Sequence, residues 1–297
     1  MKDKYKIIIM GSYNYNVARM IAGFSKIKVM YYIKDESVDD GGAFEEYWDS
    51  YGAKRGELIE SYTSLVDFIF VCGYTKIIKT ELLSKYIFVN IHAGNLPKWR
   101  GTSANSWAII NGDYNIAYTL HRVTEELDGG PIYFKFEYLL KEDEKYGDGR
   151  RQLETLLEEG LEDVMVGICE GRIQAQQQTG KYVYCSSFRK EDGLIADWNI
   201  DTAKILGLFK VFGAPYGSGL NLLYKGSIYE IMDISCDADY DCYECIPGAV
   251  VNKNDEYVWI KTSDTVVKIK NIRDQESNIL KASRVFKIGT RLGGAKI

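Results

Sequence analysis

The sequence predicts an α/β protein: a Rossmann-like first domain with a mostly parallel sheet, then a small C-terminal domain with an OB-like β-barrel. In the first half, short apolar runs alternate with segments of helical spacing, which is typical of buried parallel strands covered by helices on both faces. After residue 186 the apolar runs become short and closely spaced, which favours a small barrel. We expect the domains to span residues 1–183 and 184–297.

In the first domain, strands are expected where apolar runs end at turn residues such as Gly11 and Gly73. A long helix near the end of this domain is expected from an apolar stripe that includes Leu153, Leu157 and Leu161. In chain order, the predicted strands are 6–10, 27–33, 65–72, 86–91, 116–123 and 131–140, and the predicted helices are 16–24, 77–86, 103–110 and 150–170. The Gln-rich residues 174–178 are expected to form a connector.

The second domain is expected to begin with a helix at 201–211. Short strands should follow at 227–233, 249–251, 257–261 and 265–272. Their close spacing is the basis for the predicted barrel.

Composition excludes several classes of protein. The formal net charge of -5 argues against nucleic acid as the main partner, which needs a basic footprint. No apolar run is long enough to cross a bilayer, and the apolar run near the N-terminus is too short for a signal peptide, so we expect a cytoplasmic protein without membrane contact. The six scattered cysteines do not indicate a disulfide framework.

Metal and nucleotide motifs are also weak or missing. Cys242 and Cys245 have the spacing of metal ligands, but only Cys236 lies near them in the sequence and a structural zinc normally needs four ligands, so no metal is expected. The segment after Gly11 does not match the Gly-rich dinucleotide fingerprint, and no phosphate-binding P-loop motif occurs.

The most informative segment is Val89-Asn-Ile-His-Ala-Gly-Asn-Leu-Pro-Lys-Trp-Arg-Gly101. Asn90 and His92 lie two residues apart at the end of a predicted strand, so their side chains share a face. In an open parallel sheet, that end of the strands is where ligands bind. The alternative is structural: an Asn and a His near a strand end can simply satisfy backbone groups of a loop.

A second segment, Glu125-Glu-Leu-Asp-Gly-Gly-Pro131, offers a carboxylate, Asp128, followed by two glycines that permit close approach of a ligand. This segment can also be an ordinary turn. Together, however, the three side chains suit acyl transfer to an amine. Asn90 and a protonated His92 can donate to a developing oxyanion, His92 can relay a proton, and Asp128 can hold the imidazole or accept a proton through water.

These segments resemble the folate-dependent formyltransferase family. Its pattern combines an Asn-Ile-His-type strand end, a Leu-Pro-x-x-Arg-Gly-type loop and an Asp-Gly turn. The sequence has Asn90-Ile-His92, Leu96-Pro-Lys-Trp-Arg-Gly101 and Leu127-Asp-Gly-Gly130. The resemblance is strong over residues 65–140 and implies that Asn90, His92 and Asp128 are the catalytic residues.

The resemblance also implies the formyl donor, 10-formyltetrahydrofolate. It would bind beside the catalytic residues, mostly through backbone groups of two loops. The expected donor-binding residues are Gly73, Tyr74, Ile77, Ile78, Thr124, Glu125 and Leu127.

The acceptor is expected to be a nucleotide-linked amino sugar carried by dTDP, UDP or GDP, destined for a surface polysaccharide such as lipopolysaccharide. Thr119-Leu-His-Arg122 is similar to the sugar branch of the family, and His121 would contact the substrate. Gly11, Lys98 and Arg100 are further candidate substrate contacts, the two cations for phosphate. The alternatives are that His121 is a buried strand residue, that Gly11 only ends the first strand, and that the cations are solvated.

Phe188 to Trp198 resembles the entry to the C-terminal domain that tRNA and aminoarabinose formyltransferases share, with Ala196 as an extra residue. The tRNA branch grips nucleic acid with that domain. Here, residues 181–297 hold 16 Lys and Arg against 15 Asp and Glu, a net charge of +1, which is a poor phosphate grip. We therefore favour a 4-amino-4,6-dideoxy sugar as the acceptor.

Three alternatives stay open: the acceptor is a 3-amino sugar, the acceptor is methionyl-tRNA, or the protein binds folate without turnover. The family also implies a homodimer.

Overall fold

The computed structural model describes residues 4–11, 15–39, 41–56, 65–237, 239–240 and 245–293. The chain forms two compact units. The first comprises Met1–Asn105, Ile116–Tyr138 and Arg150–Ser186, and the second comprises Ser106–Asn115, Leu139–Gly149 and Ser187–Ile297. The boundary predicted at residue 183 stays a prediction, since the units are defined by contacts and interleave along the chain.

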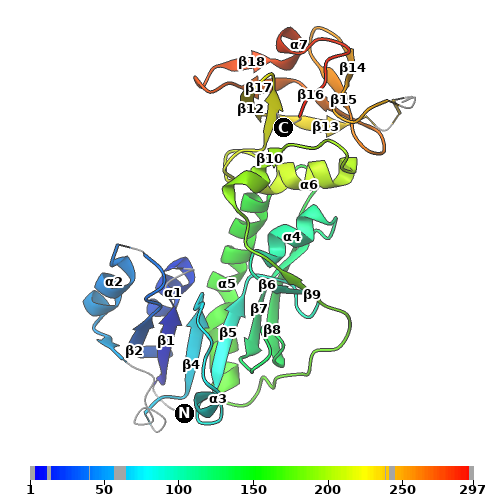
Figure 1. Cartoon of the computed structure of the whole chain (residues 1–297). Coiled ribbons are helices and arrows are strands. Elements are labelled where there is room, and N and C mark those ends of the chain that lie inside the picture. The colour runs from blue at the N-terminus through cyan, green and yellow to red at the C-terminus, as the bar shows by residue number, and fades with distance from the viewer. Residues whose placement is uncertain are drawn as a thin grey trace. The chain divides into compact units, whose positions relative to one another are not determined.

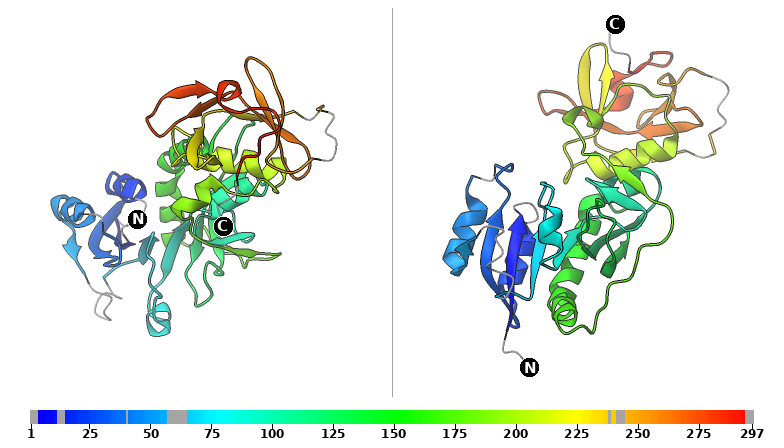
Figure 2. Two further views of the ribbon diagram at one scale, coloured as in Figure 1. Left: turned by 45° about the horizontal axis from the view of Figure 1, so that its top comes forward. Right: turned by 60° about the horizontal axis from the view of Figure 1, so that its bottom comes forward.

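The first unit contains a seven-stranded sheet in the order β3-β2-β1-β4-β5-β7-β8. Figure 1 shows β2, β1, β4, β5, β7 and β8 side by side, and the blue-to-green strands stay adjacent in the views of Figure 2. Pairing is parallel from β3 to β5 and antiparallel between β5 and β7, which confirms the mostly parallel sheet. The strands are Tyr5–Gly11 (β1), Ile27–Lys34 (β2), Lys54–Arg55 (β3), Phe68–Cys72 (β4), Phe88–His92 (β5), Asn115–Arg122 (β7) and Ile132–Leu139 (β8).

The strand order reverses direction between β1 and β4. In doubly wound sheets, such a switch point is where ligands bind, at the carboxyl ends of the strands. Gly11 ends β1 and pairs with Cys72, the last residue of β4, so that Gly73 follows at the same edge. The topology therefore places the ends of β1, β4 and β5 where a site is expected.

Helices of this unit present apolar faces at helical spacing. In α1 (Tyr15–Ala22), Val17, Ala18 and Ile21 are buried, and in α2 (Ala43–Tyr51), Phe44 and Trp48 are buried. Helix α5 (Tyr146–Cys169) buries the predicted leucine stripe, and its Gly160 lies close to the ring of Phe136 on β8. The close approach of this helix to the sheet therefore depends on a residue without a side chain.

The helix predicted at 77–86 is wrong in extent, because only Thr80–Leu83 (α3) is helical. The residues before it form a loop. Tyr74 and Ile78 of this loop, and Leu82 of α3, pack against a core cluster that includes Val71 and Phe88, so their helix-like spacing does not reflect one continuous helix. The sequence also gave no indication of α2 or β3.

The second unit is β-rich, as predicted, and its described strands form two sheets that do not close into a barrel. The five-stranded sheet has the order β10-β11-β12-β17-β18, and the four-stranded sheet has the order β13-β16-β15-β14. The elements are Lys190–Gly193 (a 3₁₀ helix), Leu194–Ile195 (β10), Thr202–Phe212 (α6), Asn221–Tyr224 (β11), Ser227–Ile231 (β12), Ile234–Cys236 (β13), Val250–Lys253 (β14), Val258–Lys261 (β15), Val266–Ile269 (β16), Asn271–Arg273 (β17), Ile279–Lys281 (β18) and Ala282–Val285 (α7).

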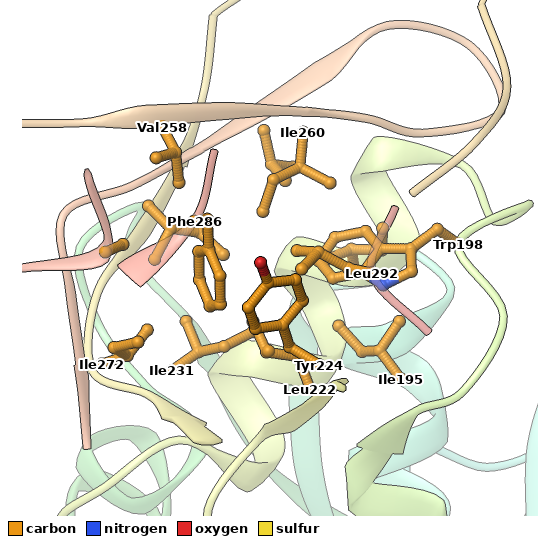
Figure 3. Close-up of a cluster of buried hydrophobic side chains, with 14 of the residues drawn as sticks. Ile195, Trp198, Leu222, Tyr224, Ile231, Val258, Ile260, Ile272, Phe286 and Leu292 are labelled. Carbon is orange, nitrogen blue, oxygen red and sulfur yellow. The ribbon is translucent and has the colours of Figure 1, made fainter. Parts of the chain in front are cut away.

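Both sheets contribute to one apolar core in this unit. Figure 3 shows Tyr224 of β11 beside Phe286, with their ring centroids 5.0 Å apart, and Ile260 of β15 above them. Trp198, from the segment that resembles the entry to the family's second domain, is 1% exposed within this same core.

The predicted strand at 265–272 is two strands, because the chain changes sheet at Lys270. The Asp233 carboxylate accepts hydrogen bonds from the backbone N–H groups of Lys270 and Asn271, at 2.8 Å and 3.1 Å. These two donors are thereby satisfied where β16 leaves one sheet and β17 joins the other.

Across the described part of the chain, no helix is both long and apolar enough to cross a membrane.

Candidate active site

The predicted site begins at the paired strands β5 and β7. Their register sets Asn90 opposite His121 and His92 opposite Thr119. Because side chains alternate along a strand, these four residues line one face of the sheet. The Asn90 Nδ2 atom lies 3.0 Å from His121 Nε2, and Thr119 donates its hydroxyl to the carbonyl of Gly94 at 2.7 Å.

Asp128, from the loop between β7 and β8, lies against this face. Its Oδ2 atom is 3.5 Å from His92 Nδ1, and its Oδ1 atom is 3.4 Å from His121 Nε2. The backbone N–H of Gly101 donates to Oδ2 at 2.8 Å. The structure therefore brings Asp128 to Asn90 and His92, from which it is distant in the sequence, and adds His121 to them.

Two backbone carbonyls orient the imidazoles. His92 Nε2 lies 2.9 Å from the carbonyl of Trp99, and His121 Nδ1 lies 3.0 Å from the carbonyl of Arg122. Since a carbonyl only accepts, each of these ring nitrogens carries the hydrogen. The other nitrogen of each ring faces the Asp128 carboxylate, so a proton gained by either histidine would be held next to a negative charge.

Burial and charge act against each other in this cluster. Burial by itself raises the pKa of Asp128, but the hydrogen bond with His121, the histidine charges and the Gly101 N–H outweigh burial and hold this pKa at about 2. Burial lowers the pKa of His92, although the Asp128 charge opposes the shift. At neutral pH the cluster thus pairs an ionised carboxylate with a neutral His92, an arrangement that can accept a proton and return it.

Arg100, a predicted phosphate contact, lies among protein partners and is 3% exposed. Its guanidinium donates to Glu126 at 2.6 Å and to Gln178 at 2.9 Å, and it stacks on the ring of Tyr182 at 3.8 Å. A phosphate role for Arg100 would require these contacts to be released. Lys98 is exposed, and its ammonium lies 4.9 Å from the ring centroid of Trp99.

The predicted donor-binding residues lie on two loops that pack beside one core cluster. Tyr74 and Ile78 from one loop, and Val123 at the start of the other, pack against the same core cluster, which includes residues of β4 and β5. On the same two loops, Ile77 is 97% exposed and Leu127 is 61% exposed. Their role as contacts to the formyl donor stays a prediction. Gly73, Thr124 and Glu125 belong to the same two loops.

A carboxylate that the sequence did not single out fixes the first of these loops. Asp35, which follows β2, is fully buried. It accepts hydrogen bonds from the backbone N–H and hydroxyl of Thr75, both at 2.6 Å, and from Ser37. Burial by itself raises the pKa of Asp35, but these hydrogen bonds hold it at about 2. Asp35 therefore ties the end of β2 to the loop after β4.

Gln178 was predicted only as part of a connector, yet it contacts the Asp128 loop. Its side-chain amide donates to the carbonyls of Asp128 and Gly130, each at 2.7 Å. No local signal marked Gln178, because its partners are about fifty residues away in the sequence. Among the described residues there is no group of three or more metal-ligating side chains, and Cys242 lies outside the described residues.

Two family models match the chain. The model described as "Formyl transferase" matches residues 20–165, and the model described as "Formyl transferase, C-terminal domain" matches residues 187–289. A methionyl-tRNA formyltransferase from Thermodesulfovibrio yellowstonii is 32% identical over 219 residues, which cover 73% of this chain and 68% of that protein. The chain spans about two thirds of the length of such curated relatives.

Solved structures share the fold. An N-formyltransferase from Helicobacter canadensis, in complex with folinic acid and dTDP-3-aminofucose, is 17% identical with a TM-score of 0.63, covering 90% of this chain and 98% of that one. A 4-N formyltransferase from Francisella tularensis is 18% identical with a TM-score of 0.56, covering 72% of this chain and 90% of that one. At such identities the likeness concerns the fold.

Proposed function

The chain belongs to the formyl transferase family, and from this premise we propose that it transfers a formyl group from 10-formyltetrahydrofolate to the amino group of a nucleotide-linked amino sugar. The observation that carries the proposal is the convergence of Asn90, His92 and Asp128 at the end of β5. The residue types, their burial and their lowered pKa values, which leave Asp128 ionised and His92 neutral at pH 7, suit proton transfer during attack by an amine.

The donor supplies the electrophilic formyl carbon and a nitrogen that must be protonated as it departs. The loops at Gly73–Ile78 and Thr124–Asp128 would hold its ring system, with Ile77 and Leu127 as exposed apolar contacts. The Helicobacter canadensis enzyme, whose fold this chain shares, was solved with folinic acid, which supports a folate at this site.

Proton movement is assigned to Asp128 and His92. The acceptor amine loses a proton as its nitrogen bonds to the formyl carbon. Asp128, ionised at neutral pH, takes that proton directly or through a water, and His92 Nδ1 at 3.5 Å can share it as an imidazolium beside the carboxylate. The same pair then returns a proton to the departing nitrogen, so that protons balance over the reaction.

Stabilisation of negative charge is assigned to Asn90. A side-chain amide donor at the carboxyl end of β5 can hydrogen-bond the formyl oxygen as the carbon is attacked. His121 contacts both Asn90 and Asp128 and so orients the donor and the base together.

A small acceptor is favoured by the charges of the second unit. There Lys268, Lys270 and Arg273 each lie within 4 Å of an acidic side chain, those of Asp237, Glu256 and Glu230 respectively. Cations paired in this way, in a domain of almost zero net charge, make a weak surface for a polyanion. We favour a 4-amino-4,6-dideoxy sugar on dTDP, UDP or GDP, in the synthesis of a surface polysaccharide by a dimeric cytoplasmic enzyme.

Two alternatives for the acceptor rest on the relatives. Methionyl-tRNA formyltransferases recur among the curated relatives, and one is 32% identical, so methionyl-tRNA is the second candidate. A 3-amino sugar is also supported, because dTDP-3-aminofucose was bound in the Helicobacter canadensis enzyme.

One assay separates these acceptors. The protein is mixed with 10-formyltetrahydrofolate and, in parallel, with a panel of 3-amino and 4-amino nucleotide sugars and with charged initiator tRNA. Mass spectrometry then measures the gain of one formyl group. We expect formylation of a 4-amino nucleotide sugar. Formylation of methionyl-tRNA, together with strong salt-sensitive tRNA binding, would replace the sugar by the second candidate.

A further inference from the structure

We propose that Gln178 and Arg100 are positioning residues that hold the Asp128 loop in its catalytic geometry, so that the connector after α5 is a working part of the site. The proposal deepens the proposed function, since it concerns how the base of that reaction is placed. It rests on a chain of contacts, all within the first unit, that begins at the backbone of Asp128.

The first contact holds the turn itself. Gln178 donates both side-chain N–H groups, one to the carbonyl of Asp128 and one to the carbonyl of Gly130, at 2.7 Å each. Asp128 has a φ of 50°, in the left-handed region that few residues other than Gly, Asn, Asp and His adopt. Such a conformation persists only where the surroundings fix it. Gln178, in the connector, contacts the backbone at Asp128 itself and at Gly130, two residues later.

Arg100 in turn fixes Gln178. Its Nη2 donates to Gln178 Oε1 at 2.9 Å, which leaves the amide N–H groups pointing at the two carbonyls. Its Nη1 donates to Glu126, two residues before Asp128, at 2.6 Å. A planar guanidinium makes both contacts in one fixed fork, which the ammonium of a lysine does not reproduce.

The connector is itself held against the catalytic loop. Val183–Cys185 (β9) pairs in parallel with Trp99–Gly101 (β6), and Gln176 exchanges two backbone hydrogen bonds with Ile132. Gly101 lies where these features meet. Its N–H donates to Asp128 Oδ2. Its φ is 86°, and a Cβ atom added at this position would lie only 2.4 Å from the carbonyl oxygen of Cys185, so a residue with a side chain would not fit here. The side chain and the backbone of Asp128 are thus both tied to this layer.

The role is one of placement, because among the described residues Gln178 contacts backbone carbonyls of the Asp128 loop and Arg100 contacts Glu126 and Gln178. Asp128 is faced by His92 from β5 and by His121 from β7. If the turn loosens, the carboxylate moves away from these imidazoles, and the stabilisation that its charge gives to a protonated histidine decreases. The histidines therefore report the position of Asp128 without any need for turnover.

The chain has only two histidines, and both contact Asp128, so their ring resonances are easily followed by NMR. We would titrate the full-length wild-type protein, Gln178→Leu, Asp128→Asn and the matched control Gln177→Leu, whose side chain is exposed. Asp128→Asn should lower the titration midpoint of His92, since a negative charge is removed. Gln178→Leu should shift the midpoint in the same direction, and Gln177→Leu should leave it unchanged.

Steady-state kinetics give the second readout. Gln178→Leu should lower kcat about 10- to 100-fold, as expected for a misplaced catalytic group, with KM for the formyl donor within roughly twofold of wild type. If Gln178→Leu does not fold, the same titration and kinetics are measured with Gln178→Met and Arg100→Lys. A Gln178 variant that folds and keeps the wild-type His92 midpoint would overturn the proposal. If the wild-type protein formylates none of the acceptors, the proposed function fails, while the NMR titration still decides the inference.

Discussion

Asn90 and His121 face each other directly across β5 and β7, with Asn90 Nδ2 3.0 Å from His121 Nε2. The same ring nitrogen lies 3.4 Å from Asp128, so one imidazole links the amide donor to the carboxylate. His121 was predicted as a substrate contact, and that role stays a prediction. Its position gives it a second one, as the link between two side chains that we propose to be catalytic.

This link predicts graded effects of substitution at His121. His121→Ala removes the contacts to Asn90 and Asp128, and we expect kcat to fall by about 10- to 100-fold, because both groups lose their alignment. His121→Gln can place an amide near the position of Nε2 and should retain more activity than His121→Ala. Steady-state kinetics with a fixed acceptor measure both variants, and equal rates for the two would argue against a linking role.

Removal of the base predicts a larger loss. Asp128→Asn keeps the shape of the side chain but removes the charge that we propose accepts the proton, so kcat should fall by about 10²- to 10⁴-fold. Binding of the formyl donor, measured by calorimetry, should change little. Asp163→Asn, on the exposed face of α5, is the matched control and should behave as wild type. Turnover that survives in Asp128→Asn would contradict the assignment of Asp128 as the base.

A residue of this site could be predicted from the sequence only where a short local pattern identifies it. Asn90 and His92 were predictable, because the alternation of one strand fixes their common face. Asp128 was predictable from a short motif. Gln178 was not predictable, because its partners in the Asp128 loop are about fifty residues away and no local pattern relates them to it. The polar residues around Gln178 are also typical of a solvated connector. The convergence of these residues is a property of the topology, which brings the loop after β7 and the segment after α5 to the end of β5.

The fold shows the same division. The alternation of apolar runs with helical segments was enough to predict the mostly parallel sheet. The helix predicted at 77–86 was wrong in extent, because Ile78 has helical spacing relative to Leu82 of α3 but belongs to the loop that packs against the same core cluster. The strand predicted at 265–272 is two strands in different sheets. The change of sheet could not be predicted locally, because the backbone N–H groups at the break donate to Asp233, more than thirty residues earlier.

The buried Asp35 predicts a specific effect on donor binding. Asp35→Asn keeps the size of the side chain but replaces one acceptor oxygen by an N–H₂ group, which opposes the N–H and hydroxyl donors of Thr75 and Ser37. The loop after β4 should loosen, so that KM for the formyl donor rises more than kcat falls. Kinetics with varied donor concentration measure this split, and an unchanged KM would separate Asp35 from donor binding.

The same carboxylate predicts how stability depends on pH. The pKa of Asp35 falls from 3.8 to about 2 on folding, so the unfolded chain binds a proton more readily. The contribution of Asp35 is therefore complete above about pH 4 and is lost as the pH falls through 3.8 toward 2. Wild type should be more stable than Asp35→Asn at pH 7 in urea unfolding, and the difference should shrink below pH 4. A difference that stays constant down to pH 3 would contradict the low pKa.

Trp198 predicts the stability of the second unit. Its side chain is 1% exposed in the core that both sheets share, so Trp198→Ala leaves a large cavity and should cost about 3–5 kcal/mol. Within the part of the chain that the structure describes, its buried Nε1 atom has no hydrogen-bond partner, so Trp198→Phe loses packing but no hydrogen bond and should cost much less. Urea unfolding followed by near-ultraviolet circular dichroism compares the two variants. If Trp198→Phe were as damaging as Trp198→Ala, the indole would have a polar partner in solution, and packing alone would not explain its burial.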